Sequence, residues 1–138
     1  MSTPTMEQHA LAEGSTFVWH EVYGPDAAAL VRFYTEALGF GTQEMPMGEM
    51  GSYTMLTKNG TAVAGVMSTS AGSPAEGAPP HWSTYIAVDD VDASLAKCQE
   101  LGATIVHGPM DVPSVGRMVL IKDPQGAVVW LFKDATPA

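Results

Sequence analysis

The stretch His81-Trp-Ser-Thr-Tyr-Ile-Ala-Val-Asp-Asp-Val-Asp-Ala-Ser-Leu-Ala-Lys-Cys-Gln-Glu-Leu-Gly102 decides the fold, because its pattern changes from that of a strand to that of a helix. Side chains from residue 83 to residue 88 alternate between two faces, which predicts a strand. Asp89 or Asp90 is expected to cap a helix, and Gly102 is expected to end it. The apolar face of this helix is formed by residues three to four positions apart, namely Val91, Leu95, Cys98 and Leu101.

The same strand–helix unit occurs earlier in the chain. Residues 16–23 predict a strand, Asp26 is expected to cap the helix that follows, and Gly39 is expected to end it. The apolar stripe of this helix contains Leu30, Phe33, Tyr34, Ala37 and Leu38. Three short strands are predicted after each helix, at residues 40–44, 52–57 and 61–67 in the first copy and at 103–107, 117–122 and 127–133 in the second, with a loop over 108–116. The order β-α-β-β-β therefore occurs twice, which predicts two similar modules.

These modules define the expected domain organisation. Residues 1–14 are predicted to be a flexible arm, and residues 15–138 a single domain. Within the domain, module one covers residues 16–67, a linker covers 68–80, and module two covers 81–133. The expected fold class is α+β, with two βαβββ modules forming a paired, barrel-like curved sheet that carries its helices outside and encloses a cavity.

The composition excludes several classes of partner. The net charge is −9 and the chain has only six lysines and arginines, which argues against nucleic acid and against an anionic membrane surface. No apolar run approaches the roughly 18 residues of a membrane span, and no signal peptide is visible. Cys98 is the only cysteine, so no intrachain disulfide is possible. A cytoplasmic protein is expected.

Three segments in fixed order carry a resemblance to a known family. They are Asp26 through Phe33-Tyr34 to Leu38-Gly39, then Tyr85-Ile-Ala-Val-Asp-Asp-Val-Asp92, and then Gly116-Arg117 through Asp123-Pro124-Gln-Gly126 to Leu131-Phe132. The chain from Phe17 to Lys133 thereby resembles the vicinal-oxygen-chelate superfamily of glyoxalase I, bleomycin-resistance proteins and extradiol dioxygenases. The run Phe17-Val-Trp-His-Glu-Val22 with Pro80-His-Trp82 looks like its glyoxalase-like subgroup. This resemblance implies a small-molecule ligand in an internal cavity, and a homodimer.

The resemblance also identifies where a metal would bind. Metal-dependent members of the superfamily use His, Glu or Gln at four inward positions, which correspond here to Trp19, Ala64, Ser83 and Trp130. None of these residues is a usual ligand of a divalent metal. We therefore expect no metal and no other cofactor. A divalent-metal site built from His20, Glu21 and His81 would require a register shift of one residue in the predicted strand.

The candidate catalytic residue is Glu21. If Trp19 faces the cavity, so does Glu21, because the two residues are two positions apart on a strand. Its carboxylate could act as a general base or as a hydrogen-bond acceptor. The alternative is that it pairs with a buried tyrosine or with Arg117 and only orders the sheet.

The candidate ligand-binding residues are mostly aromatic. The predicted inward set consists of Trp19, Tyr23, Tyr85, Trp130 and Phe132, with Ser83 and Arg117 as polar members. Aromatic walls with a few polar groups suit a planar or hydrophobic ligand, and ordinary core packing is the alternative. Arg117 would either clamp an anionic group of the ligand or pair with one of the many acidic side chains. His81 would be either an acid or base of the pocket or a capping residue.

The sequence therefore predicts a glyoxalase-like protein that binds a small, partly aromatic or hydrophobic molecule without metal. Two alternatives stay open. One is a glyoxalase-like lyase or isomerase with Glu21 as the base, and the other is a dioxygenase or lyase with rearranged divalent-metal ligands.

Overall fold

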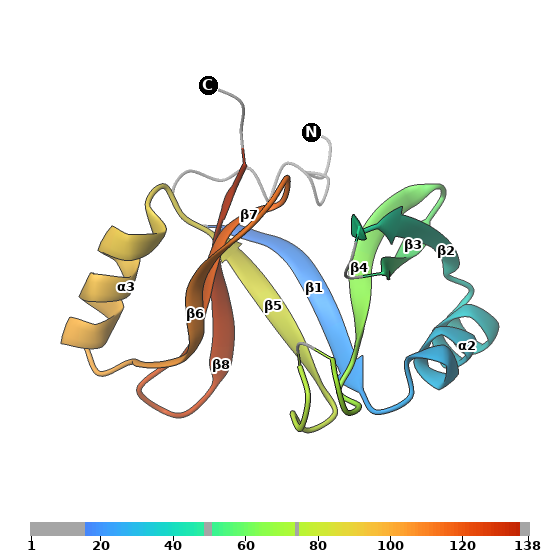
Figure 1. Ribbon diagram of the computed structural model, residues 1–138, viewed down its shortest axis with the longest axis horizontal. Helices are drawn as coiled ribbons and strands as arrows, with labels where there is room; N and C mark the ends of the chain where they lie inside the picture. Colours follow the sequence, from blue (N-terminus) through green and yellow to red (C-terminus); the bar gives the residue numbers. More distant parts are fainter. Residues whose placement is uncertain (1–15, 49–50, 74, 136–138) are drawn as a thin grey trace, which may run out of the picture. The chain divides into compact units, whose positions relative to one another are not determined.

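The structure is a computed structural model that describes residues 16–48, 51–73 and 75–135 (Figure 1). The predicted arm at residues 1–14 lies outside the described residues. The described residues divide into two compact units, one within residues 19–83 and the other formed by residues 16–18 and 84–135. Neither of the two α-helices in the described part of the chain is long and apolar enough to cross a membrane.

The first unit contains one helix and a four-stranded sheet. Its strands are β1 (Thr16–Gly24), β2 (Gly41–Pro46), β3 (Ser52–Lys58) and β4 (Thr61–Ser68), which lie side by side in the order β2-β3-β4-β1. Strands β2, β3 and β4 form an antiparallel meander, whereas β1 runs parallel to β4 with Glu21 opposite Gly65. The helix is α2 (Ala27–Leu38), which begins where the Asp26 side chain accepts a hydrogen bond from the backbone N–H of Ala29.

Helix α2 packs on the sheet through only part of its predicted stripe. The core beneath it consists of Val22, Leu56, Ala64 and Val66, with Ala27, Leu30, Val31, Tyr34 and Phe40 packed against them. Phe33 and Leu38 are 56% and 57% exposed, and Ala37 is also exposed. The prediction that these three residues share the packed stripe is wrong, because the sheet contacts a narrower strip of the helix than the apolar pattern covers.

Strand β4 contains a bulge that changes which of its residues share a face. Leu56 pairs with Ala64, but the neighbouring Thr57 pairs with Ala62, so Val63 is an extra residue on β4. Counting from the turn at Gly60 therefore errs by one position. Ala64, predicted to face the cavity, instead lies in the core beneath α2, and Gly65 takes the face on which Tyr53 lies.

The second unit repeats this arrangement. Its strands are β5 (His81–Ala87), whose first three residues belong to the first unit, β6 (Thr104–Val112), β7 (Gly116–Lys122) and β8 (Val128–Asp134), in the order β5-β8-β7-β6. Strand β5 runs parallel to β8 with Tyr85 opposite Trp130, and β6, β7 and β8 are antiparallel. Helix α3 (Val91–Glu100) begins at Asp90, whose side chain accepts from the backbone N–H of Ala93. The predicted α+β class with two βαβββ modules is confirmed.

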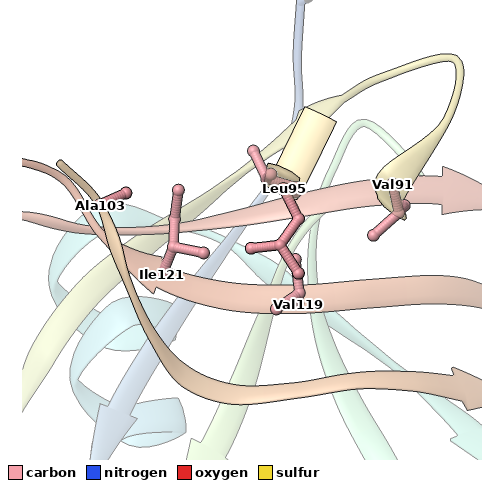
Figure 2. Close-up of a cluster of buried hydrophobic side chains, with 6 residues drawn as sticks. Val91, Leu95, Ala103, Val119 and Ile121 are labelled. Carbon is pink, nitrogen blue, oxygen red and sulfur yellow. The ribbon is translucent and has the colours of Figure 1, made fainter. Parts of the chain in front are cut away.

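The core of the second unit lies between α3 and its sheet. Figure 2 shows Val91 and Leu95 of the helix above Val119 and Ile121 of β7. Leu101, predicted on the same apolar face, is 67% exposed. The prediction is wrong because the helix ends at Glu100, and Leu101 is the C-cap residue in a non-helical conformation.

The predicted loop over residues 108–116 is largely a strand. Strand β6 continues to Val112, past irregular pairing between His107 and Met110. Pro109 lies within this irregular section, where a residue without a backbone N–H does least damage to the ladder. Pro109 was therefore misleading as a loop signal, whereas Pro113 lies in the turn that joins β6 to β7.

Candidate functional site

The candidate site of the first unit is centred on Glu21 of β1. Strand alternation gives Trp19, Glu21 and Tyr23 one face of β1, and Val22 the other face, toward the core beneath α2. Glu21 is only 4% exposed. A carboxylate with so little exposure needs hydrogen-bonding partners to offset the loss of water.

Two tyrosines provide such partners. The hydroxyl of Tyr23 donates a hydrogen bond to Glu21 Oε1, and the hydroxyl of Tyr53 donates one to Glu21 Oε2 at 2.5 Å. The Tyr53 oxygen in turn accepts a hydrogen bond from the indole Nε1 of Trp19 at 3.0 Å. Each carboxylate oxygen thus accepts from one phenol, as suits an ionised carboxylate that has acceptors only. Of the two alternatives for Glu21, the structure contains the pairing with a buried tyrosine.

Tyr53 was not among the predicted site residues. Burial raises the pKa of its hydroxyl well above the ordinary value, and the negative charge of Glu21 and the hydrogen bond to it act in the same direction. Tyr53 is therefore a neutral donor at physiological pH. The Asn-Gly turn after β3 indicates the hairpin, but the extra residue Val63 shifts the pairing beyond it, so the turn alone does not place Tyr53.

Gly65 makes the position of Tyr53 possible. A Cβ atom added to Gly65 would lie 1.4 Å from the Tyr53 hydroxyl oxygen and 2.2 Å from its Cζ. The end of the tyrosine ring thus lies directly on the glycine backbone. No larger residue at position 65 is compatible with this ring position.

His81 of β5 extends the cluster. Its ring stacks flat on Tyr23, with ring centres 4.6 Å apart and planes 4° apart. His81 Nδ1 lies 2.6 Å from the carbonyl oxygen of Pro79. Because a carbonyl oxygen only accepts, Nδ1 carries the hydrogen, and in the neutral ring Nε2 is then the acceptor.

Ser83 lies two residues after His81 on β5 and so shares its strand face. The residue is 5% exposed, and its Oγ has no hydrogen-bond partner among the described residues. A buried hydroxyl without a partner is costly. Among the described residues, Ser83 Oγ and Ser73 Oγ are the buried side-chain atoms without a hydrogen-bond partner, and Ser83 is the one on the strand face of His81.

The second unit contains an aromatic cluster. The rings of Tyr85 and Trp130 are stacked with centres 5.2 Å apart and planes 5° apart. Phe132 meets Tyr85 edge-on at 6.0 Å, and His107 meets Trp130 edge-on at 6.5 Å. The structure thus brings together the three aromatic residues that the sequence assigned to the second module, and adds His107.

Arg117 is engaged by carboxylates. Its guanidinium donates to both carboxylate oxygens of Asp92, at 2.8 and 2.9 Å, and to Asp111 at 3.1 Å. Hydrogen bonding to Arg117 lowers the pKa of Asp92; desolvation opposes this effect, and the guanidinium charge supports it. Of the two alternatives for Arg117, the structure contains the pairing with acidic side chains.

The residues at the superfamily's metal positions do not fit a metal. Trp19, Ser83 and Trp130 offer an indole, a hydroxyl and another indole, and correction for the bulge replaces Ala64 by Gly65, which has no side chain. The indole nitrogen of Trp19 is a donor, already bonded to Tyr53. No group of three His, Cys, Asp or Glu side chains suitable for a metal occurs within residues 16–48, 51–73 and 75–135.

Fold and site together define a protein of two βαβββ modules whose metal positions carry no usual metal ligands. The family model of the Glyoxalase/Bleomycin resistance protein/Dioxygenase superfamily matches residues 16–131. The chain belongs to this superfamily, as the sequence resemblance predicted.

Two curated relatives are similar over most of this chain. The "Putative glyoxylase CFP32" of Mycobacterium bovis is 42% identical over 116 residues, which cover 83% of this chain and 44% of the relative. The "Anthracycline biosynthesis protein DnrV" of Streptomyces peucetius is 32% identical over 124 residues, covering 81% of this chain and 45% of the relative. The chain thus spans about half the length of the curated relatives it matches.

Solved structures share the fold. Methylmalonyl-CoA epimerase from Mycobacterium tuberculosis is similar with a TM-score of 0.60 and 18% identity, over 97% of this chain and 94% of that one. The Streptomyces coelicolor methylmalonyl-CoA epimerase in complex with 2-nitronate-propionyl-CoA has a TM-score of 0.60 and 22% identity, over 87% and 97%. At these identities the likeness concerns the fold alone.

Proposed function

We propose that the chain binds a small, partly aromatic or hydrophobic molecule without a metal, and that Glu21 is the polar anchor of the binding site. The observation that carries this proposal is the buried Glu21 carboxylate, with one phenolic hydroxyl on each oxygen. Carboxylate oxygens retain further acceptor capacity after one hydrogen bond each. A ligand hydroxyl or N–H group can therefore bind to Glu21 beside aromatic side chains that contact its apolar part.

Other residues support a partly aromatic ligand. Ser83 Oγ offers a buried hydroxyl without a partner among the described residues, and His81 Nε2 offers an acceptor. Within the same unit, Trp19, Tyr23 and Tyr53 place aromatic rings beside the Glu21 carboxylate. The relative named for anthracycline biosynthesis points in the same direction, because anthracyclines contain fused planar rings that bear hydroxyl groups.

Calorimetric titration with a hydroxyanthraquinone, and with the parent anthraquinone that has no hydroxyl, tests this proposal. The wild-type chain should bind the hydroxylated compound more tightly. Glu21→Gln should weaken that binding about tenfold or more, since a hydrogen bond to a charged group contributes about 1.5–3 kcal/mol. Glu100→Gln is the matched control, because Glu100 is exposed and pairs only weakly with Lys97.

Two results would count against the proposal. One is that neither compound binds to the wild-type chain, and the other is that Glu21→Gln and Glu100→Gln bind equally well. Dialysis against a chelator should leave binding unchanged. If the purified protein contains one equivalent of metal, and the chelator removes both the metal and the binding, the proposal that binding is independent of metal is wrong.

A second candidate function is a lyase or isomerase in which Glu21 removes a proton. The fixed carboxylate and the relative named a glyoxylase favour it. We place it second because both carboxylate oxygens already accept hydrogen bonds from phenols, and a substrate proton would compete with them. Proton NMR in D2O distinguishes the two: exchange of a C–H hydrogen next to a carbonyl, abolished by Glu21→Gln, would establish the second function.

We also propose that the chain forms a homodimer, as the superfamily resemblance implies, and that it acts in the cytoplasm. The ligand-binding role of Arg117 is the weakest part of the predicted site, because its donors are occupied by Asp92 and Asp111.

A further inference from the structure

We propose that Tyr53 is the positioning residue of the Glu21 site, and that Gly65 provides the space that its hydroxyl requires. This inference rests on the binding function proposed above and adds two residues to it. Neither residue was identified from the sequence.

The first step concerns the direction of the Tyr53 hydroxyl. Its oxygen accepts from Trp19 Nε1 at 3.0 Å, and its hydrogen points to Glu21 Oε2 at 2.5 Å. A hydroxyl that accepts on one side and donates on the other has one orientation, and such chains of hydrogen bonds strengthen one another. Tyr53 therefore fixes one oxygen of Glu21, while Tyr23 fixes the other.

The second step concerns the room for this hydroxyl. Gly65 pairs with Glu21 on one side and with Met55 on the other. The Tyr53 ring reaches across the sheet and ends over Gly65, where an added Cβ would overlap the hydroxyl oxygen. Position 65 faces Tyr53 because of the extra residue Val63 in β4. The extra residue Val63, Gly65 and Tyr53 thus act together to place the Tyr53 hydroxyl beside Glu21.

The third step concerns where Gly65 and the Tyr53 hydroxyl lie relative to the metal-ligand positions of the superfamily. Position 65 corresponds, after the correction for the bulge, to the last-strand metal-ligand position of module one. A metal ligand there would begin with a Cβ atom where this chain has the phenolic oxygen of Tyr53. The chain thus places a hydrogen-bond donor to Glu21 where metal-dependent members of the superfamily have a ligand side chain.

The test compares Tyr53→Phe and Gly65→Ala with Tyr34→Phe. The first removes the hydroxyl but keeps the ring, and the second displaces the ring. Tyr34 is the matched control, because its hydroxyl also accepts an indole hydrogen bond, from Trp82 Nε1 at 3.0 Å. Two quantities are measured: the affinity for the hydroxyanthraquinone by calorimetry, and the positions of the three indole N–H resonances by two-dimensional NMR.

The expected result is specific to each variant. Tyr53→Phe and Gly65→Ala should each weaken binding about tenfold, and should shift the indole resonance of Trp19 but not that of Trp82. Tyr34→Phe should shift the resonance of Trp82 and leave binding unchanged. The double variant Tyr53→Phe/Gly65→Ala should have about the same affinity as the single variant that binds more weakly, because both substitutions act through the same hydroxyl.

The outcomes separate the two proposals. If the wild-type chain binds the probe and both variants bind equally well, the positioning role is wrong and the binding function stands. If the two losses of affinity add fully in the double variant, Gly65 and Tyr53 do not act through the same hydroxyl, and that part of the inference is wrong. If the wild-type chain binds neither compound, the proposed function fails and the inference fails with it. The dispersion of the NMR spectrum shows that each variant is folded.

Discussion

Charged side chains of this molecule are held in two different ways. The carboxylate of Glu21 is buried, and phenolic hydroxyls bond to both of its oxygens. Arg117 lies on the second unit, where it forms ion pairs with Asp92 and Asp111, two carboxylates with exposed side chains. Because water screens exposed pairs, the second arrangement contributes less energy than its hydrogen bonds suggest. A mutation at the buried Glu21 site should therefore lower the stability of the fold more than a mutation at the exposed Arg117 site.

The Arg117–Asp92 pair makes stability depend on pH. Its hydrogen bonds hold the pKa of Asp92 in the folded chain below the ordinary 3.8. A carboxyl group whose folded pKa is depressed adds stability above its unfolded pKa, and this stability disappears as the pH falls through the folded value. Arg117→Gln should therefore lower Tm slightly at neutral pH, and the difference from wild type should shrink as the pH falls below about 3.8.

Thermal unfolding followed by circular dichroism at a series of pH values measures this effect. Lys97→Gln serves as the control, because it removes the more distant pair with Glu100, at 3.6 Å. A difference in Tm for Arg117→Gln that stays constant down to acid pH would show that packing of the side chain, and not the ion pair, is responsible.

Residue positions were predictable from the sequence where they depend on local alternation. Glu21 and Tyr23 share a face because side chains of a strand repeat every two residues, and this pattern is visible in any strand. Tyr53 and Gly65 were not found, because their meeting depends on the extra residue Val63. A bulge is a property of the pairing between two strands, and one strand's pattern does not reveal it.

At the scale of elements, both helices begin where the sequence predicted. Asp26 and Asp90 cap α2 and α3 through their carboxylates, and such caps follow from the chemistry of a few neighbouring residues. The ends and packed faces were less predictable. They depend on where the sheet meets the helix, as the exposure of Leu38 and Leu101 shows.

Helix α3 offers a direct comparison between a packed and an exposed leucine of the same apolar pattern. Leu95 is buried in the core with Val119, whereas Leu101 is exposed. Leu95→Ala should therefore lower the free energy of unfolding by about 2–5 kcal/mol, and Leu101→Ala should change it by less than about 0.5 kcal/mol. Urea denaturation of both variants measures the two values. Equal losses would mean that Leu101 packs against something in solution.

At the scale of the whole molecule, the duplicated βαβββ order was the most predictable feature. Each copy has its own helix cap and its own glycine turn, such as those at Gly60 and Gly126. A pattern that would be weak evidence for a module when seen once is therefore repeated at matching positions. The chemistry was less predictable from the same repeat. Side chains such as Glu21 and Tyr53 act through contacts between strands, and the repeat fixes only the strands themselves.

The predicted homodimer can be tested on the exposed face of α2. Phe33 and Leu38 are both more than half exposed, and large exposed apolar side chains are candidates for an interface. Light scattering after size exclusion should give a mass of about twice the 14.5 kDa of one chain. Phe33→Ser and Leu38→Ser together should restore the single-chain mass, whereas Leu101→Ser, at the exposed C-cap of α3, should not. A wild-type mass of one chain would contradict the dimer, and a dimer that survives the paired substitution would place the interface elsewhere.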